Sequence, residues 1–209
     1  MKVMVDLFCG RGGWTKGFMA HGWHCIGIDL HPQPDYPGEF IQADIAQLYE
    51  LPLADFYCCS SPCEQFSVHG MKHFHPNPKW PWLGIALFEH ARQMLDATGK
   101  PYVMENVRPA QGFIGRSDYH FGPFHLWGNS LGAMWPWPAC DLARLKKGID
   151  VGSSKLVKGM TSEEKRAYRA QFVWNQAWSS SKKRKRDKAK AAEIPEKLSA
   201  HIAQMAGAM

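Results

Sequence analysis

Residues 58–67, with the sequence CCSSPCEQFS, hold three cysteines and could serve two kinds of chemistry. With the histidines that follow, these cysteines offer the ligand types that zinc prefers. The spacing does not supply two pairs of cysteines two to four residues apart, however. Cys58 and Cys59 also end an apolar run in which neighbouring side chains face opposite ways. We therefore expect no metal site and interpret Cys58 and Cys59 as small buried hydrophobic residues.

Cys63 differs from these two because it follows Pro62, in a turn just beyond the carboxyl end of a predicted strand. Enzymes with α/β folds place their chemistry at such strand ends, and the proline stiffens the approach to the thiol. The next predicted strand carries Glu105, in the sequence MENV, at its own end. A thiol and a carboxyl group at adjacent strand ends form a candidate catalytic pair, with Cys63 as the nucleophile.

A second candidate site is the glycine-rich stretch DLFCGRGGWTKGF, which places Gly10, Gly12 and Gly13 between a strand and its helix. Glycine lets the backbone approach a ligand closely, and the start of a helix offers free N–H groups. Asp29 ends the second predicted strand, at the spacing of about twenty residues expected for a carboxylate that binds ribose hydroxyls. A tight turn that binds nothing would explain the loop alone. Loop and acid together favour a nucleoside-containing cofactor.

The elements that position these residues alternate between strand and helix over the first half of the chain. Short apolar runs predict strands, and apolar positions three and four residues apart predict helices that Gly22 and Gly99 end. This alternation predicts an α/β fold, a Rossmann-like doubly wound and mostly parallel sheet. The predicted strands are residues 2–8, 23–30, 40–45, 54–60 and 101–107, and the predicted helices are residues 14–22 and 82–99.

The pattern is looser after Val107. Glycines, prolines and aromatic residues predict a strand or hairpin within residues 119–128, and a capping box predicts a helix over 161–178. A basic linker follows, and an amphipathic helix over 194–206, with Pro195 in its first turn, closes the chain. We expect three parts: a catalytic and cofactor-binding domain, a small basic segment, and a helix that returns to the first domain. Their predicted bounds are residues 1–140, 141–193 and 194–209.

Composition narrows the class of protein. The chain has 209 residues, 45% of them hydrophobic, which predicts one packed α/β domain with a small appendage. The net charge of +6 favours a polyanionic partner. The first residues do not form a secretion signal, and no stretch has the length and apolarity of a membrane span. We therefore expect a cytoplasmic protein with reduced thiols and no membrane partner.

The motifs, in their order along the chain, resemble those of the DNA (cytosine-5)-methyltransferases. DLFCGRGGWTKGF resembles the family's first motif, and GIDLHP and ADI stand where the next two cofactor motifs belong. SPCEQFS resembles the Pro-Cys loop, and LFEHARQMLDATGKPYVMENV resembles the helix and the Glu-Asn-Val motif that follow. IPEKLSAHIAQ is similar to the last motif, a C-terminal helix that returns to the cofactor domain. The resemblance covers residues 1 to about 107 and roughly the last fifteen.

The resemblance implies S-adenosylmethionine as the cofactor. Phe8 and Asp44 would contact its adenine, with Ile45 packed on the ring, while Asp29 would bind the ribose hydroxyls. The cofactor-binding residues that the matched motifs imply are Asp6, Phe8, Gly10, Gly12, Gly13, Asp29, Leu30, Asp44 and Ile45.

The resemblance also implies methyl transfer to carbon 5 of cytosine. Cys63, in the turn that Pro62 stiffens, would add as a thiolate to carbon 6. Glu105 would protonate ring nitrogen 3, which requires a pKa raised by burial above ~4.3, and Asn106 would hold the geometry. The expected partner is double-stranded DNA with the target cytosine flipped out, bound by a monomeric bacterial or phage-encoded enzyme. RNA is the alternative substrate, and a non-catalytic module that binds S-adenosylmethionine or DNA is the alternative class.

Two departures from the family pattern concern substrate binding. The family's Gln-x-Arg-x-Arg motif is missing from SDYHFGPFHLWGN, where Arg116, His120 or His125 would substitute for its arginines. Residues 141–193 are short for a target-recognition domain, and their run KKRKRDKAK is either a DNA contact or a solvated linker. The remaining residues predicted to bind substrate are Ser67, Lys72, Arg108, Lys183 and Arg184.

Overall fold

The computed structural model describes residues 1–66, 81–134, 136, 137, 161 and 193–209. By its internal contacts the chain divides into two units, Met1–Pro138 with Ile194–Met209, and Ala139–Glu193. Apart from Thr161 and Glu193, the second unit lies outside the described residues. The helix predicted over 161–178, the basic linker and the exact domain bounds therefore stay predictions.

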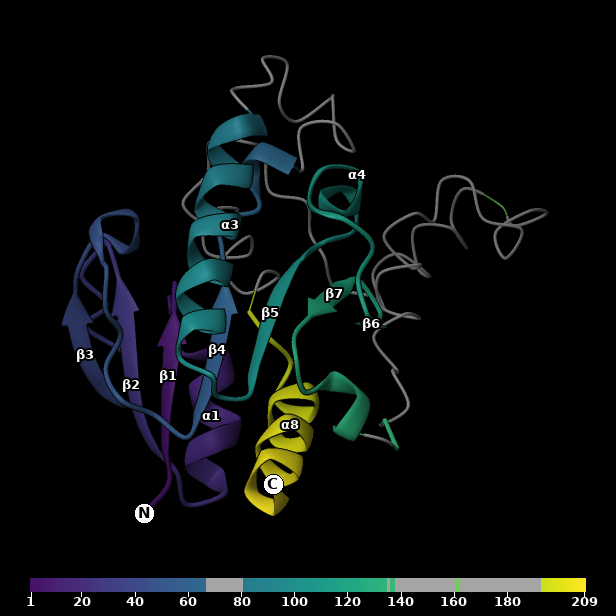
Figure 1. Ribbon diagram of the computed structural model, residues 1–209. Coiled ribbons are helices and arrows are strands. Elements are labelled where there is room, and N and C mark those ends of the chain that lie inside the picture. Colours follow the sequence, from purple (N-terminus) through teal and green to yellow (C-terminus); the bar gives the residue numbers. More distant parts are fainter. Residues whose placement is uncertain (67–80, 135, 138–160, 162–192) are drawn as a thin grey trace. The chain divides into compact units, whose positions relative to one another are not determined.

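The first unit is built on a seven-stranded sheet of order β3-β2-β1-β4-β5-β7-β6 (Figure 1). Strands β1 to β5 run parallel to one another, and β7 is antiparallel to both β5 and β6. This arrangement confirms the predicted doubly wound, mostly parallel sheet, and β6 and β7 confirm the hairpin. The strands are β1 (Val3–Leu7), β2 (His24–Asp29), β3 (Glu39–Gln42), β4 (Phe56–Ser60), β5 (Tyr102–Val107), β6 (Tyr119–Phe121) and β7 (Phe124–Trp127).

Helices cover both faces of the sheet. α3 (Pro81–Ala97) covers one face, where Phe88 and Leu95 join a core with residues of β1, β4 and β5 (Figure 1). α1 (Gly13–Ala20) covers the other face and packs closely against α8 (Glu196–Ala208) from the end of the chain. Shorter helical pieces include η1 (Ile45–Gln47), η2 (Arg108–Ala110), α4 (Gln111–Ile114) and η3 (Leu131–Met134). No helix among the described residues is long and apolar enough to cross a membrane.

Local sequence explains where most elements stop. Gly22 and Gly99 follow α1 and α3 with φ of 78° and 64°, the left-handed conformation that glycine adopts at no steric cost, as predicted. The predicted strand over 40–45 is wrong at its end: β3 stops at Gln42 because Asp44 caps η1 through a bond from the N–H of Ala46. Pro195 is also misplaced by one position, because it is the extended N-cap of α8 (ψ 137°) rather than part of its first turn.

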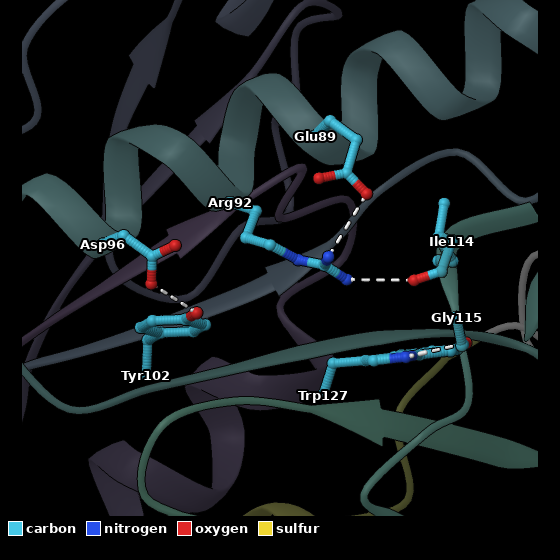
Figure 2. A network of polar contacts seen from close by, with 7 residues as sticks. All are labelled: Glu89, Arg92, Asp96, Tyr102, Ile114, Gly115 and Trp127. Carbon is cyan, nitrogen blue, oxygen red and sulfur yellow. Dashed lines mark hydrogen bonds and ion pairs between the residues drawn. The ribbon is translucent and has the colours of Figure 1, made fainter.

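A polar network ties α3 to the segment after β5 and to β7 (Figure 2). Arg92 of α3 pairs with Glu89 at 3.2 Å and donates to the carbonyl of Ile114. The indole N–H of Trp127 donates to the carbonyl of Gly115 at 3.2 Å. Both carbonyls lie in the connection that leads from β5 to the β6–β7 hairpin. The network therefore fixes that hairpin beside the carboxyl-terminal half of β5.

Candidate active site

The predicted site residues gather where β1, β2, β4 and β5 end. Because these strands are parallel, the loops that follow them lie along one edge of the sheet. Ser60, the last residue of β4, is in register with Glu105 of β5. The Pro-Cys turn and Glu105 therefore lie at the ends of adjacent parallel strands, as predicted.

The glycine loop after β1 has a backbone suited to a close ligand. Phe8, Gly10 and Gly12 all have positive φ, at 56°, 47° and 73°. A Cβ on Gly10 would meet no atom within 4 Å, so the loop is open there. Asp29 holds the loop to β2, because its carboxylate accepts from the N–H groups of Gly10 and His31, both at 3.0 Å. Gly13 then begins α1 with its N–H groups directed to the same edge.

Asp6 differs from the other predicted cofactor residues because its side chain is only 1% exposed, beneath the loop. The hydroxyl of Thr15 donates to Asp6 Oδ2 at 3.0 Å and lies 2.5 Å from the hydroxyl of Tyr36. Burial raises the pKa of Asp6 well above its usual range, against the lowering effect of the bond from Thr15. The contact of Asp6 with a cofactor stays a prediction, and the bond to Thr15 gives Asp6 a supporting role under the loop.

Sequence reasoning missed Thr15 and Tyr36 in this arrangement. Tyr36 reaches under the loop because Gly27 of β2 leaves room, and a Cβ on Gly27 would lie 2.5 Å from the Tyr36 hydroxyl oxygen. An isolated glycine inside an apolar strand often marks such a close approach. Gly27 was therefore the available signal.

The other predicted adenine contacts differ in exposure. Leu30 is 52% exposed beyond β2 and offers an apolar surface, whereas Ile45 is 2% exposed and packs in the core under α3. Both oxygens of Asp44 already accept local bonds, from the N–H of Ala46 and from Gln47 Nε2. A carboxylate oxygen can accept a further bond, so Asp44 keeps the capacity to bind an amino group.

The turn that carries Cys63 is fixed by Asn106. The fully buried Asn106 donates through Nδ2 to the carbonyl and the hydroxyl of Ser61, at 3.1 and 3.0 Å. On the other side, the N–H of Phe66 donates to the carbonyl of Cys63 at 3.1 Å, and Phe66 is buried. Cys63 itself is partly exposed, unlike the other free cysteines of the described residues.

Glu105 is 9% exposed and lies between Ser60 of β4 and Leu126 of β7. Cys58 and Cys59 are fully buried, as predicted for small hydrophobic residues. Burial, followed by the negative charge of Asp6, raises the pKa of both thiols, so neither is a ready thiolate. No three His, Cys, Asp or Glu side chains within the described residues are grouped so that they could hold a metal ion.

His125 lies on β7, in the stretch that stands in place of the missing arginine motif. It is opposite Asn106 in the β5–β7 ladder and opposite His120 in the hairpin, and the two rings stack at 5.3 Å. Its Nδ1 is 2.9 Å from the hydroxyl of Ser117. Burial, then His120 and Arg108, lowers the pKa of His125 to about 4, so the imidazole is neutral at pH 7. Arg108 is exposed immediately after β5.

The structure argues against Arg116 as a substitute. Arg116 lines a cavity of about 300 Å³ together with Tyr102, the first residue of β5. This cavity is at the amino end of β5, and Glu105 and Asn106 are at the opposite end. The other residues predicted to bind substrate lie outside the described residues: Ser67, Lys72, Lys183 and Arg184.

Strand order, an antiparallel β7 and a glycine loop followed by an acid at the end of β2 together define a Rossmann-like methyltransferase fold. The family model for C-5 cytosine-specific DNA methylases matches residues 2–113, and the chain belongs to this family.

Individual relatives are distant. The type II methyltransferase M.HgiCII of Herpetosiphon aurantiacus is 28% identical over 115 residues, which are 50% of this chain and 25% of that protein. The chain thus spans about a quarter of the length of this curated relative. The structure of the Schizosaccharomyces pombe Dnmt2 methyltransferase gives a TM-score of 0.37 at 15% identity, over 53% of this chain and 35% of that one. An S-adenosylmethionine-dependent methyltransferase from Clostridium acetobutylicum gives 0.33 at 12% identity, over 52% and 44%. Scores this low carry no argument about function.

Proposed function

We propose that this chain transfers a methyl group from S-adenosylmethionine to carbon 5 of cytosine in DNA through a covalent adduct with Cys63. The observation that carries the proposal is the pair of hydrogen bonds that Asn106 Nδ2 donates to the carbonyl and the hydroxyl of Ser61, which join the end of β5 to the Pro-Cys turn. This contact joins the segment that leads to the partly exposed Cys63 to Asn106, the residue after Glu105. Membership of the C-5 cytosine-specific DNA methylase family supports the same reaction.

The residues at the ends of β1 and β2 fit the cofactor. The open space at Gly10 and the N–H groups at the start of α1 suit the methionine end, and Asp29 suits the ribose hydroxyls. The exposed Leu30 and the side chain of Phe8 would flank the adenine, with Asp44 as acceptor for its amino group. Asp6 would act from beneath through Thr15, by keeping the loop in place. When bound, S-adenosylmethionine supplies an electrophilic methyl group.

The catalytic steps would use residues of β4 and β5. The Cys63 thiolate forms a bond to carbon 6 of cytosine while Glu105 gives a proton to ring nitrogen 3, so electron density gathers at carbon 5. After carbon 5 has gained the methyl group, a base removes its proton, the bond to sulfur breaks and nitrogen 3 returns its proton to Glu105. Pro62 limits the freedom of the turn. The buried position of Glu105 favours its protonated form, as the first step requires.

Substrate binding would use the carboxyl edge and the basic segment. The neutral His125, with His120 and Arg108 near it, would contact the flipped base or its phosphate. Residues 141–193, with Lys183 and Arg184, would form a reduced recognition region that mainly neutralises phosphates. Ser67 and Lys72, in the loop after the nucleophile, would also meet the DNA. We propose that the protein acts as a monomer.

The test is incubation of the full chain with labelled S-adenosylmethionine and either double-stranded DNA or RNA, followed by identification of the modified base. Transfer to carbon 5 of cytosine in DNA is expected. Transfer to RNA alone would replace the DNA substrate by the alternative branch of the same reaction, and binding without transfer would favour a non-catalytic module.

The adduct is tested with DNA that contains 5-fluorocytosine, because fluorine at carbon 5 cannot leave as a proton. The wild type should be trapped covalently, and Cys63→Ala should lose both trapping and transfer while it keeps cofactor affinity. Cys25→Ala is the matched control, since Cys25 is a buried thiol on β2. Full activity of Cys63→Ala would refute the mechanism.

A further inference from the structure

Trp14 connects the start of α1 to the end of β4. It is the second residue of α1 and only 1% exposed, and its indole Nε1 donates to Ser60 Oγ at 2.9 Å. An indole N–H can only donate, so the oxygen of Ser60 is the acceptor. The hydroxyl proton of Ser60 is consequently directed away from Trp14. Neither residue has a role in the mechanism proposed above.

Ser60 stands beside Glu105. The two residues are in register on the parallel strands β4 and β5, and neighbouring strands are about 4.8 Å apart. Residues in register point to the same face of a sheet. That face is the one covered by α1, because Trp14 reaches Ser60 from there. The Ser60 hydroxyl is therefore a hydrogen-bond donor at the flank of the Glu105 side chain.

The described groups on this face near Glu105 come from β7, α1 and β4. Leu126 of β7 is opposite Glu105 and apolar, and Trp14 comes from α1. On β4, the titratable neighbour on the same face is the thiol of Cys58, whose pKa burial raises well above its usual range. The Cys63 thiol follows in the turn beyond Ser60. The Ser60 hydroxyl is the donor that β4 offers to an ionised Glu105 on this face.

We propose that Trp14 and Ser60 are positioning residues for Glu105: the indole fixes the Ser60 oxygen, and the Ser60 hydroxyl then donates to the carboxylate whenever Glu105 is ionised. The inference rests on the proposed function, in which Glu105 alternates between its protonated and ionised forms. The carbonyl of Trp14 in turn accepts a bond from the Ser199 hydroxyl of α8. The helix that follows the cofactor loop and the last helix are thus joined to Ser60, and the proposed bond would extend this link to Glu105.

The proposed contact shifts the pKa of Glu105 in a definite direction. A donor to the ionised form lowers the pKa of a carboxyl group, so its removal raises that pKa. Ser60→Ala should therefore raise the pKa of Glu105, by about one pH unit for a charge-assisted hydrogen bond. Ser60→Thr keeps a hydroxyl on a residue that strands accommodate well and should restore the wild-type value. Trp14→Phe keeps an aromatic ring but loses the N–H, so it should give a smaller rise.

The experiment is an NMR titration of glutamate carboxyl carbons in the full chain, with the Glu105 signal identified by its loss in Glu105→Gln. Ser130→Ala is the matched control, because Ser130 is a buried serine that donates to the carbonyl of Tyr102 at the other end of β5. The proposal requires a rise in Ser60→Ala, recovery in Ser60→Thr and no change in Ser130→Ala. A Glu105 midpoint in Ser60→Ala equal to that of the wild type or of the control would overturn it. Trp14→Phe repeats the test should Ser60→Ala not fold.

Rates of methyl transfer measured over the same pH range separate this inference from the proposed function. Activity should fall as pH rises through the pKa of Glu105, and this fall should move to higher pH in Ser60→Ala. A shifted titration without any cytosine methylation would preserve the contact with Glu105 and refute the function. Methylation that needs Cys63 and Glu105, with an unshifted titration, would preserve the function and refute the positioning role.

Discussion

Gly17 offers a direct test of how the two ends of the chain pack together. It lies in the middle of α1, where a Cβ would be 2.5 Å from both the backbone nitrogen of Ala200 and the carbonyl carbon of Ser199 in α8. The same Cβ would also collide with the hydroxyl oxygen of Ser199, which donates to the carbonyl of Trp14. Because the clash involves backbone, no side-chain rotation can relieve it, and α8 must move away from α1.

Two effects of Gly17→Ala oppose each other. Alanine favours the helix by about 1 kcal/mol relative to glycine. Overpacking costs about 1–3 kcal/mol, and loss of the bond from Ser199 to Trp14 costs about 1 kcal/mol more. The cost of the clash therefore exceeds the gain in helix propensity. We expect the free energy of unfolding to fall by about 2 kcal/mol relative to the wild type, in urea denaturation of the full chain.

Gly207→Ala is the matched control. Gly207 is a helical glycine in α8, and a Cβ there would meet no atom within 4 Å. This substitution should leave stability unchanged or raise it by up to about 1 kcal/mol. A Gly17→Ala variant as stable as the wild type would show that α8 does not pack closely against α1 at Gly17.

Three further perturbations test the charges of the site and its surroundings. Because the pKa of His125 is lowered to about 4, the unfolded chain binds its proton first as the pH falls below 6.5. Between pH 6.5 and 4 the free energy of unfolding of the wild type should thus fall by up to about 3 kcal/mol more than that of His125→Asn. Identical pH profiles of the urea midpoint in the two proteins would contradict this. Asp29→Ala should weaken S-adenosylmethionine binding, measured by calorimetry, by about tenfold or more, which corresponds to the loss of one charge-assisted hydrogen bond. Asp55→Ala, beside the start of β1, should leave this binding unchanged. Charge reversal within residues 182–186 should weaken DNA binding about equally for all sequences and flatten its salt dependence; a loss confined to one sequence would show base reading instead.

Much of the fold was predictable because local signals agree with it. The buried strands are short apolar runs, and Gly22 and Gly99 mark the ends of their helices through their backbone conformation. Errors occurred where a side chain competes with the regular backbone pattern. Asp44 ends an apparently extended run by capping η1, a local bond that apolar periodicity does not register.

The candidate site was predictable to the extent that it depends on strand ends. Cys63 follows β4 and Glu105 lies near the end of the adjacent parallel strand β5, so a correct sheet order brings them to one edge. The contacts that fix their side chains join positions far apart in the chain. Thr15 meets Tyr36, and Trp14 meets Ser60, through single hydrogen bonds that leave no periodic trace in the sequence. A buried tryptophan looks the same in sequence whether its N–H is used or not.

These contacts explain why two serines precede Pro62. Trp14 holds Ser60 from the face of the sheet covered by α1. Asn106 is on the face of Met104, which packs in the core under α3, and it holds Ser61. Successive residues of an extended chain point to opposite faces, so the hydroxyl groups of two consecutive serines can accept hydrogen bonds from opposite faces of the sheet. The chain therefore enters the Cys63 turn from a segment that is fixed on both faces of the sheet. An apolar residue in place of either serine would remove the hydrogen bond on one of these faces.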